Sequence, residues 1–316
     1  MAWLLRRVAL SLVLVWVVAS IVFMALHLVP GDPAELLLST GGTAPDAAAV
    51  AELRERLGLE RPLLDQYGAF IGGLMRGDLG TSLVDDYPVA DEIALRLPRT
   101  LELIAAASLL SLLVAIPAGT HAALHRGGAF DRASSAVAAL LLAIPVFVIG
   151  TLLVLVLAQE LHWMPAGGYV PLMQAPGRHF TLLLMPALAI AQGLTAVLFR
   201  MTRASVLDVL SRDFVRTARA KGLMPRRILL RHVLRNALSP VLTVLGLHMG
   251  ALLGGTVLVE YVFNWPGLST PLLRAVDARD YPTVVGIVLT ISTLFLLINL
   301  VMDLLYAVLD PRVRAG

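Results

Sequence analysis

Six long apolar runs, each free of Asp, Glu, Lys and Arg, constrain this sequence more than any other feature. About 20 residues of helix, at roughly 1.5 Å per residue, span the roughly 30 Å hydrocarbon layer of a bilayer. A central Arg or Asp costs about 2.5 to 3.5 kcal/mol on insertion, so charged residues mark where such helices end. The sequence predicts membrane-spanning helices at Val8–Val29, Leu103–Leu124, Ala133–Gln159, Phe180–Phe199, Asn236–Val259 and Tyr281–Met302.

The composition agrees with lipid as the main solvent of this chain. Of the 316 residues, 58% are hydrophobic and only 15% are charged, which leaves too little polar surface for a water-soluble globule. Without water, each backbone polar group must be satisfied within the spanning segment, and long unbroken apolar runs favour helices over a barrel. We therefore expect an all-α, polytopic membrane protein.

The first run has an alternative interpretation as a cleavable signal peptide, because Arg6 and Arg7 precede it. The run is longer than the 7 to 15 residues that are typical of a signal-peptide core, and no small-x-small cleavage pattern occurs between Leu26 and Pro33. We expect an uncleaved membrane anchor.

Basic residues predict the orientation, because cytoplasmic segments retain positive charge during insertion. The N-terminus, the segment between the second and third runs, and the C-terminus would lie on the same side of the membrane. These three segments carry Arg6, Arg7, Arg126, Arg132, Arg312 and Arg314. Between the fourth and fifth runs, Arg200–Arg235 holds ten basic residues and two acidic ones, whereas Pro30–Arg99 holds six Arg and twelve acidic residues. Both termini are predicted to be cytoplasmic. Because this topology explains the net charge of +3, we expect the lipid bilayer, and not nucleic acid, as partner.

Three parts follow along the chain: residues 1–29, a mainly acidic external segment at 30–99, and a five-helix part at 100–316. Within the external segment, Asp46 is predicted to cap a helix that runs to about Leu57, and a second amphipathic helix is predicted at Pro62–Met75. Gly77–Gly80 should end it. The apolar stripes of these helices fit either a folded cap or a docking surface for another protein.

The basic segment between the fourth and fifth runs has helical periodicity. Leu207, Leu210, Phe214 and Ala218 recur at the spacing of one helix face, and Gly222 interrupts the pattern. Pro225 is suited to the first turn of a second helix. In that helix one face would carry Arg227, Arg231 and Arg235, and another would carry Leu230, Val233 and Leu234. Such a pair of helices would bind anionic lipid headgroups or seat in a groove of a cytosolic protein.

Residues 213–223 (DFVRTARAKGL) and 232–240 (HVLRNALSP) resemble the coupling loop of inner-membrane permease subunits of ATP-binding cassette importers, in the dipeptide, oligopeptide and nickel group. The general pattern of that loop is Glu-Ala-Ala, three residues, Gly, nine residues, then apolar-x-Leu-Pro. This chain keeps Ala218, Gly222 and Leu234 but has Arg216 for Glu, and Arg235 for Pro. Residues 28–33, 77–82 and 303–312 extend the resemblance over nearly the whole chain.

The resemblance implies a type I importer permease fold in a bacterial or archaeal plasma membrane. It also implies a homologous second permease, two cytosolic ATPase subunits that bind ATP and Mg²⁺, and an external substrate-binding protein. Peptides are the cargo we favour, with nickel chelates, glutathione or opines as alternatives. The expected ATPase contact comprises Asp213, Arg216, Thr217, Ala218, Arg219, Ala220, Lys221, Gly222 and His232.

No enzymatic chemistry is predicted for the chain itself. It has no Gly-x-x-x-x-Gly-Lys-Ser/Thr phosphate loop, and its one lysine is Lys221. It also lacks His-Glu-x-x-His, Gly-x-Ser-x-Gly and cysteine, so we expect no catalytic residue, cofactor or metal. The scattered histidines share no metal-ligand spacing: His27, His121, His162, His179 and His248.

Glycines and prolines are the remaining informative residues inside the apolar runs. Gly246, Gly250 and Gly254 form a ridge that would allow another helix, or alternatively a peptide, to approach closely. Prolines that can kink the second, third and fourth helices are Pro117, Pro145 and Pro186.

Carboxylates are absent from the runs. Glu102, Glu260 and Asp303 lie near helix ends, where interfacial solvation would explain them. An ion-coupled secondary transporter, the main alternative, usually needs carboxylates near the membrane midplane.

Overall fold

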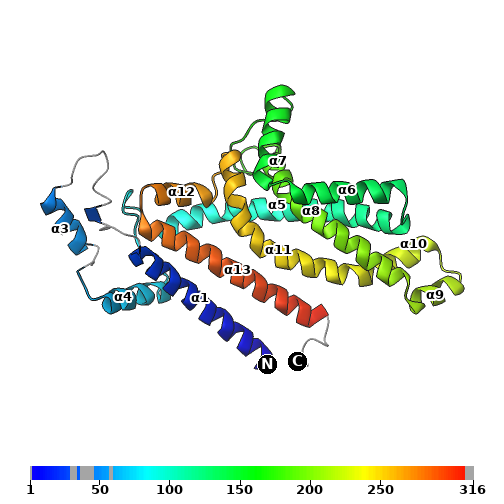
Figure 1. Cartoon of the computed structure of the whole chain (residues 1–316), viewed down its shortest axis with the longest axis horizontal. Helices are drawn as coiled ribbons and strands as arrows, with labels where there is room; N and C mark the ends of the chain where they lie inside the picture. The colour runs from blue at the N-terminus through cyan, green and yellow to red at the C-terminus, as the bar shows by residue number, and fades with distance from the viewer. Residues whose placement is uncertain (1, 29–33, 36–45, 57–59, 310–316) are drawn as a thin grey trace. The chain divides into compact units, whose positions relative to one another are not determined.

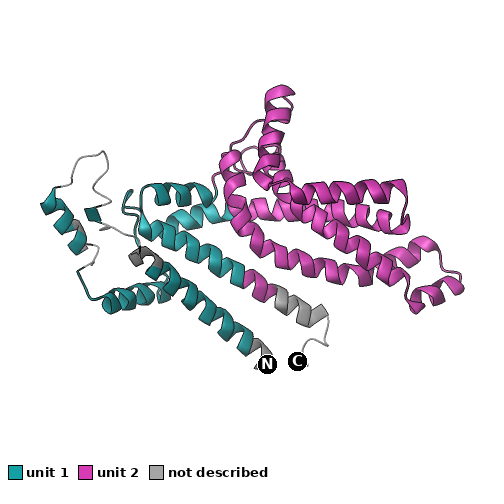
Figure 2. Cartoon of the chain, in the orientation of Figure 1, with its two compact units in different colours: residues 1–98, 267–296 teal, residues 99–266, 297–316 magenta. Residues whose placement is uncertain are grey.

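The computed structural model describes residues 2–28, 34–35, 46–56 and 60–309, which form helices joined by short turns and contain one isolated β-bridge, Thr81–Pro88. Two compact units divide the chain, Met1–Pro98 with Gly267–Leu296 and Arg99–Pro266 with Leu297–Gly316 (Figure 2). In chain order the helices (Figure 1) are α1 Ala2–Leu28, α3 Ala47–Arg56, α4 Leu63–Met75, α5 Val89–Leu124, α6 Ala129–Ala143, α7 Val146–Leu153, the π-helix η1 Val154–Glu160, α8 Pro176–Leu210, α9 Asp213–Ala220, α10 Pro225–Ile228, the π-helix η2 Leu229–Val233, α11 Leu234–Val262, α12 Ser269–Asp277 and α13 Tyr281–Leu309.

Five of the six predicted spans are continuous helices. Helices α1, α5, α8 and α13, and the continuous run α10–η2–α11, are long and apolar enough to cross a membrane. Two of the predicted kinks do not interrupt their helices, because α5 continues through Pro117 and α8 continues through Pro186. Helix α5 also begins at Val89, inside the segment expected to be external.

The third predicted span, Ala133–Gln159, is not one straight helix. It consists of α6 and the pair α7–η1, which meet at an angle of 103°. The break lies at Ile144, whose ψ of 126° is extended, because Pro145 excludes the helical conformation for the residue before it. The Ile144 carbonyl, left without a helical partner, accepts a hydrogen bond from Nε2 of Gln192 at 3.1 Å. A neighbouring helix thus satisfies the backbone group that the proline frees.

Helix α8 is the centre of the second unit, and 67% of the residues in its apolar window are buried. Leu183, Ile190 and Phe199 are among its buried side chains. Its backbone passes very close to α5 at Gly119, where an added Cβ would lie 2.8 Å from the Phe199 carbonyl oxygen. Only glycine allows this approach.

The first unit contains α1, α3 and α4, and here most of the sequence predictions for the external segment are confirmed. The Asp46 carboxylate accepts a hydrogen bond from the Ala48 amide at 3.2 Å, as expected of a helix cap. Helix α4 packs on α1 through Phe23 and Phe70, whose ring centroids are 5.4 Å apart. Gly77, with a φ of 77°, ends α4.

A short loop between α4 and α5 is held rigidly within the first unit. The buried Asp280 carboxylate accepts hydrogen bonds from the hydroxyls of Ser82 at 2.6 Å and Thr283 at 2.7 Å, and from the Leu83 amide at 3.1 Å. Because this carboxylate ties residues 82–83 to the start of α13, the loop is anchored by long-range contacts.

Candidate functional site

The segment singled out by its charge and periodicity forms a compact helical turn between α8 and α11 (Figure 1). Gly222 has a φ of 72°, which lies in the left-handed region, and it reverses the chain after α9. Pro225 occupies the first turn of α10, where its missing N–H costs nothing. Both turn predictions are confirmed.

The helix predicted to contain Leu207, Leu210, Phe214 and Ala218 is interrupted, which corrects the sequence interpretation. Helix α8 ends at Leu210 and α9 begins at Asp213, because Arg212 is extended with a ψ of 146°. The Ser211 hydroxyl donates to the Asp208 carbonyl at 2.7 Å and competes with the helical pattern.

The inner face of α9 is part of a hydrophobic cluster that this chain supplies by itself. Val215 is fully buried and Ala218 is 7% exposed. They pack in one cluster with residues of α8, α10, η2 and α11, namely Val206, Val209, Ile228, Val233 and Ala237. Burying an aliphatic side chain such as that of Val215 contributes about 1.5 to 3 kcal/mol. Helix α9 is therefore a docked element, fixed to the ends of two long helices.

The outer face of α9 is polar and open. Arg216, Thr217, Arg219, Ala220 and Lys221 are exposed. The guanidinium of Arg216 lies 3.7 Å from the Asp213 carboxylate in a solvated ion pair, which contributes little to stability. A short helix with a fixed inner face and a basic outer face is suited to contact an acidic surface of another protein.

The apolar residues of this segment differ in their exposure. Ala218 is part of the chain's own cluster, so its small size serves internal packing. Phe214 is 43% exposed and Leu230 is 55% exposed within this chain. His232 in η2 is half-buried, and its carbonyl accepts a hydrogen bond from Nδ2 of Asn236 at 2.6 Å.

A groove of about 480 Å³ lies beside the exposed Phe214. Helices α8 and α11 form its walls, and its polar lining includes Asp208, Arg212 and Asn236. Arg212 donates to the Asp208 carboxylate at 2.8 Å. Together, the groove and the outer face of α9 form one surface of mixed apolar and charged character.

The glycine ridge of α11 divides into two parts. Gly246 and Gly250 are buried within the chain. Gly254 is exposed, and an added Cβ there would meet no atom within 4 Å. A close helix approach that sequence periodicity did not indicate occurs at Gly119.

An ion pair between a buried carboxylate and a partly exposed arginine was also missed by the sequence analysis. Nη2 of Arg203 on α8 donates to the carboxylate of Asp131 on α6 at 2.8 Å, and its Nε donates to the other oxygen at 2.5 Å. The Gly127 amide donates to the same carboxylate at 2.8 Å. This pair joins the start of α6 to α8.

Carboxylates at the ends of the long helices are more buried than predicted. Glu260 is fully buried and accepts a hydrogen bond from the Thr100 hydroxyl at 2.6 Å, so interfacial solvation does not explain it. Glu102 lies 2.8 Å from Nε2 of the buried His179, at ion-pair distance without a hydrogen bond. The Asp303 side chain lies outside the described side chains.

Residues that could hold a metal do not gather in the part of the chain that the structure describes, where no group of three or more His, Asp or Glu residues is present. His179 instead donates from Nδ1 to the Val170 carbonyl at 2.8 Å and packs edge-on against Trp265. The rings of the exposed His121 and His125 are tilted toward each other, with centroids 4.3 Å apart.

Comparison with known proteins agrees with this arrangement. Residues 115–315 match the family described as "Binding-protein-dependent transport system inner membrane component", and residues 1–104 match its N-terminal component. The chain is 42% identical over 299 residues to the glutathione transport system permease protein GsiC of Escherichia coli (strain K12), covering 95% of this chain and 94% of the relative. It is 41% identical to GsiC of Shigella flexneri serotype 5b (strain 8401), with the same coverage.

The family works with a partner permease, an ATPase and a binding protein, and its members do not hydrolyse ATP themselves. The six apolar segments and the docked helix α9 therefore belong to a multi-pass protein of the inner membrane, and the chain is a member of the binding-protein-dependent family of ATP-binding cassette importer permeases.

Proposed function

We propose that this chain forms one half of the transmembrane pathway of an ATP-driven importer for short peptides. The complete importer would contain this chain, one homologous permease, two cytosolic ATPase subunits and an external binding protein. The observation that carries this proposal is the construction of α9, whose inner residues Val215 and Ala218 are buried while its basic outer face is open.

The ATPase contact would lie on the outer face of α9 and on the groove beside Phe214. When the ATPase subunits close on ATP, they would displace α9, and the cluster around Val215 would transmit the motion to α8 and α11. Arg216 and Arg219 would meet acidic groups of the ATPase. Reversing these charges with Arg216→Glu and Arg219→Glu should weaken ATPase assembly while the chain still inserts. Assembly equal to that of the unmodified chain would contradict this contact.

Both termini and α9 would lie in the cytoplasm, as the distribution of Arg predicts. The chain contains no cysteine, so a single introduced cysteine can be labelled without background. Thr217→Cys on α9 and Val84→Cys in the loop before α5 are both exposed positions for this test. A membrane-impermeant maleimide added to intact cells should label Val84→Cys and spare Thr217→Cys. The reverse pattern would overturn the orientation.

Gly254 would face the second permease. Its surface is open in this chain, although glycines at this spacing are typical of close helix contacts. In the assembled importer, Gly254→Cys should form a cross-link to the second permease, whereas a cysteine at the lipid-exposed Leu12 should not. Equal cross-linking at the two sites would argue against a specific interface.

The substrate class comes from the relatives and from the membrane segments. Glutathione, the compound named for the relatives, is itself a small peptide, and it is therefore the first substrate to test. The apolar segments carry few charges, which fits a cargo that is recognised through its backbone and apolar groups.

Expression of this chain with its adjacent open reading frames, followed by reconstitution in liposomes, should give ATP-dependent uptake of glutathione or a dipeptide. Uptake of a nickel chelate alone would overturn the peptide proposal. Uptake driven by an ion gradient without ATP would contradict ATP-driven transport.

A further inference from the structure

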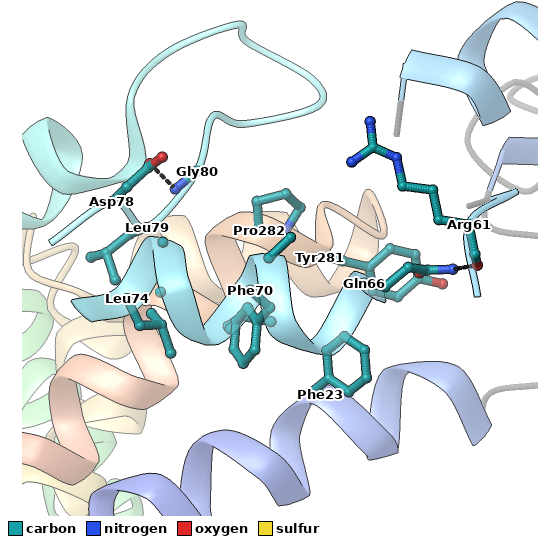
Figure 3. Close-up of a pocket in the computed structure, with 14 residues that line it drawn as sticks. Phe23, Arg61, Gln66, Phe70, Leu74, Asp78, Leu79, Gly80, Tyr281 and Pro282 are labelled. Carbon is teal, nitrogen blue, oxygen red and sulfur yellow. Dashed lines mark hydrogen bonds between the residues drawn. The ribbon is translucent and has the colours of Figure 1, made fainter. Parts of the chain in front are cut away.

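A groove of about 370 Å³ lies in the first unit, between α1, α4 and α13 (Figure 3). Three helices contribute apolar side chains to it: Phe23 from α1, Phe70 and Leu74 from α4, and Val285 from α13. Helix α4 is held across α1 by the Phe23–Phe70 stacking and by a 2.6 Å hydrogen bond between the hydroxyls of Tyr67 and Ser20. The groove is therefore a formed feature of the packed helices.

The position of the groove along the two spanning helices indicates its level in the membrane. Phe23 lies in the last two turns of the uncharged apolar run Val8–Val29, and Tyr281 is the first residue of α13 and of the run Tyr281–Met302. The groove therefore lies toward the end of both runs, near the level where hydrocarbon meets the lipid headgroups. Tyrosine is enriched at this level, and Tyr281 lines the groove.

The polar side chains of the groove are Arg61, Gln66, Asp78 and Tyr281. Two of them are already engaged, because Gln66 donates to the Arg61 carbonyl at 2.9 Å and the Asp78 carboxylate accepts from the Gly80 amide at 2.9 Å. Over the described residues, the Arg61 guanidinium forms no hydrogen bond or ion pair. An arginine at the rim of an apolar groove is suited to hold a phosphate group, since its planar fork matches phosphate oxygens.

We propose that this groove binds a membrane phospholipid. Its acyl chain would lie along Phe70, Leu74 and Val285, and its phosphate would meet Arg61. Phospholipid is the occupant that fits this depth, because apolar side chains of α1 such as Leu12 and Ile21 are exposed and the helix is therefore solvated by lipid. The bound lipid would complete the contact between α4 and the two spanning helices.

The probe is phosphatidylglycerol that carries a diazirine in one acyl chain, incorporated into nanodiscs with the complete importer. After illumination, mass spectrometry should map lipid adducts to peptides that contain Phe70, Leu74 or Val285. Leu74→Trp, which fills the groove, should abolish these adducts. Arg61→Ala should lower them about tenfold, as expected for loss of a charge-assisted contact. The matched control is Arg76→Ala, which removes an exposed arginine of the same segment that does not line the groove, and it should have no effect.

A second probe tests the phosphate contact separately from the contact with the acyl chain. A diacylglycerol with the same diazirine but no phosphate should label the groove about tenfold less than phosphatidylglycerol does, and Arg61→Ala should remove this difference. Equal labelling by the two lipids would overturn the phosphate contact. Adducts that persist in Leu74→Trp, or cross-links from the groove to another protein chain, would overturn the lipid site. If Leu74→Trp does not fold, the surface variant Arg61→Ala decides the question.

Discussion

Gly222 provides the most direct test of how α9 is attached. Its φ of 72° is left-handed, and an added Cβ would meet no atom within 4 Å. A side chain at this position is therefore opposed by backbone conformation alone and not by a collision. Gly222→Val should strain the turn after α9, whereas Gly222→Asn should be tolerated because asparagine adopts the left-handed conformation more readily.

The size of the effect of Gly222→Val on the docking of α9 follows from two free energies. The left-handed conformation costs a residue with a Cβ about 1 to 2 kcal/mol. Burial of Val215, which holds α9 in place, contributes about 1.5 to 3 kcal/mol. The strain is therefore comparable with the burial energy that holds α9 in place. A strain of about 1 to 2 kcal/mol corresponds to a factor of about 5 to 30 in the equilibrium between docked and released α9.

Hydrogen exchange of the amides in residues 213–220, measured on the complete importer, reports this shift. We expect exchange to accelerate about 5- to 30-fold in Gly222→Val, with ATP hydrolysis retained and substrate uptake reduced. The matched control is Gly77→Val, because Gly77 has a φ of 77° and equally open surroundings but lies far along the chain from α9. Unchanged exchange in Gly222→Val, or equal damage by Gly222→Asn, would refute the reasoning.

Three further changes test the contacts around α9 and at the helix ends. Val215→Ala should destabilise the docking of α9 by about 2 kcal/mol through loss of buried methyl groups, measured as faster amide exchange in α9. A larger effect on α7, which packs in another hydrophobic cluster, would argue against local docking. Arg203→Ala should lower the stability of the second unit because it removes the charged partner of the Asp131 carboxylate, and the double variant with Asp131→Asn should recover part of the loss in thermal denaturation. Thr100→Val should cost about 1.5 to 3 kcal/mol by removing a buried hydrogen bond to Glu260, whereas Thr100→Ser should retain most of the stability.

The broad organisation of the chain could be predicted from its sequence, because it depends on residue type and length. Apolar length places the long helices, and Pro225 and Gly222 act through their own backbone restrictions, so their positions are visible without a structure. The same holds for Asp46, whose capping role depends on an amide only two residues away. Features with a cause within a few residues can therefore be recognised in the sequence.

Features that depend on distant partners could not be predicted. Asp131 and Arg203 are 72 positions apart, and Thr100 and Glu260 are 160 apart, so neither pair has a signal in spacing. Phe214 was placed in one helix with Leu207 and Leu210 because periodicity was counted across Ser211, where α8 ends. The sharp break at Ile144 leaves a carbonyl that accepts a hydrogen bond from Gln192, 48 positions away, and this partner has no signal in spacing.

The two faces of α9 have a consequence for how importers of this kind diversify. The residues that fold the helix, Val215 and Ala218, are different from those that point outward, Arg216 and Arg219. If the outer face contacts the ATPase subunit, as we propose, substitutions there would alter the choice of ATPase subunit without unfolding α9. Grafting the outer residues of a related permease onto this α9 should then transfer its preference for an ATPase subunit, so that new subunit combinations can arise by a few surface changes in an existing pair.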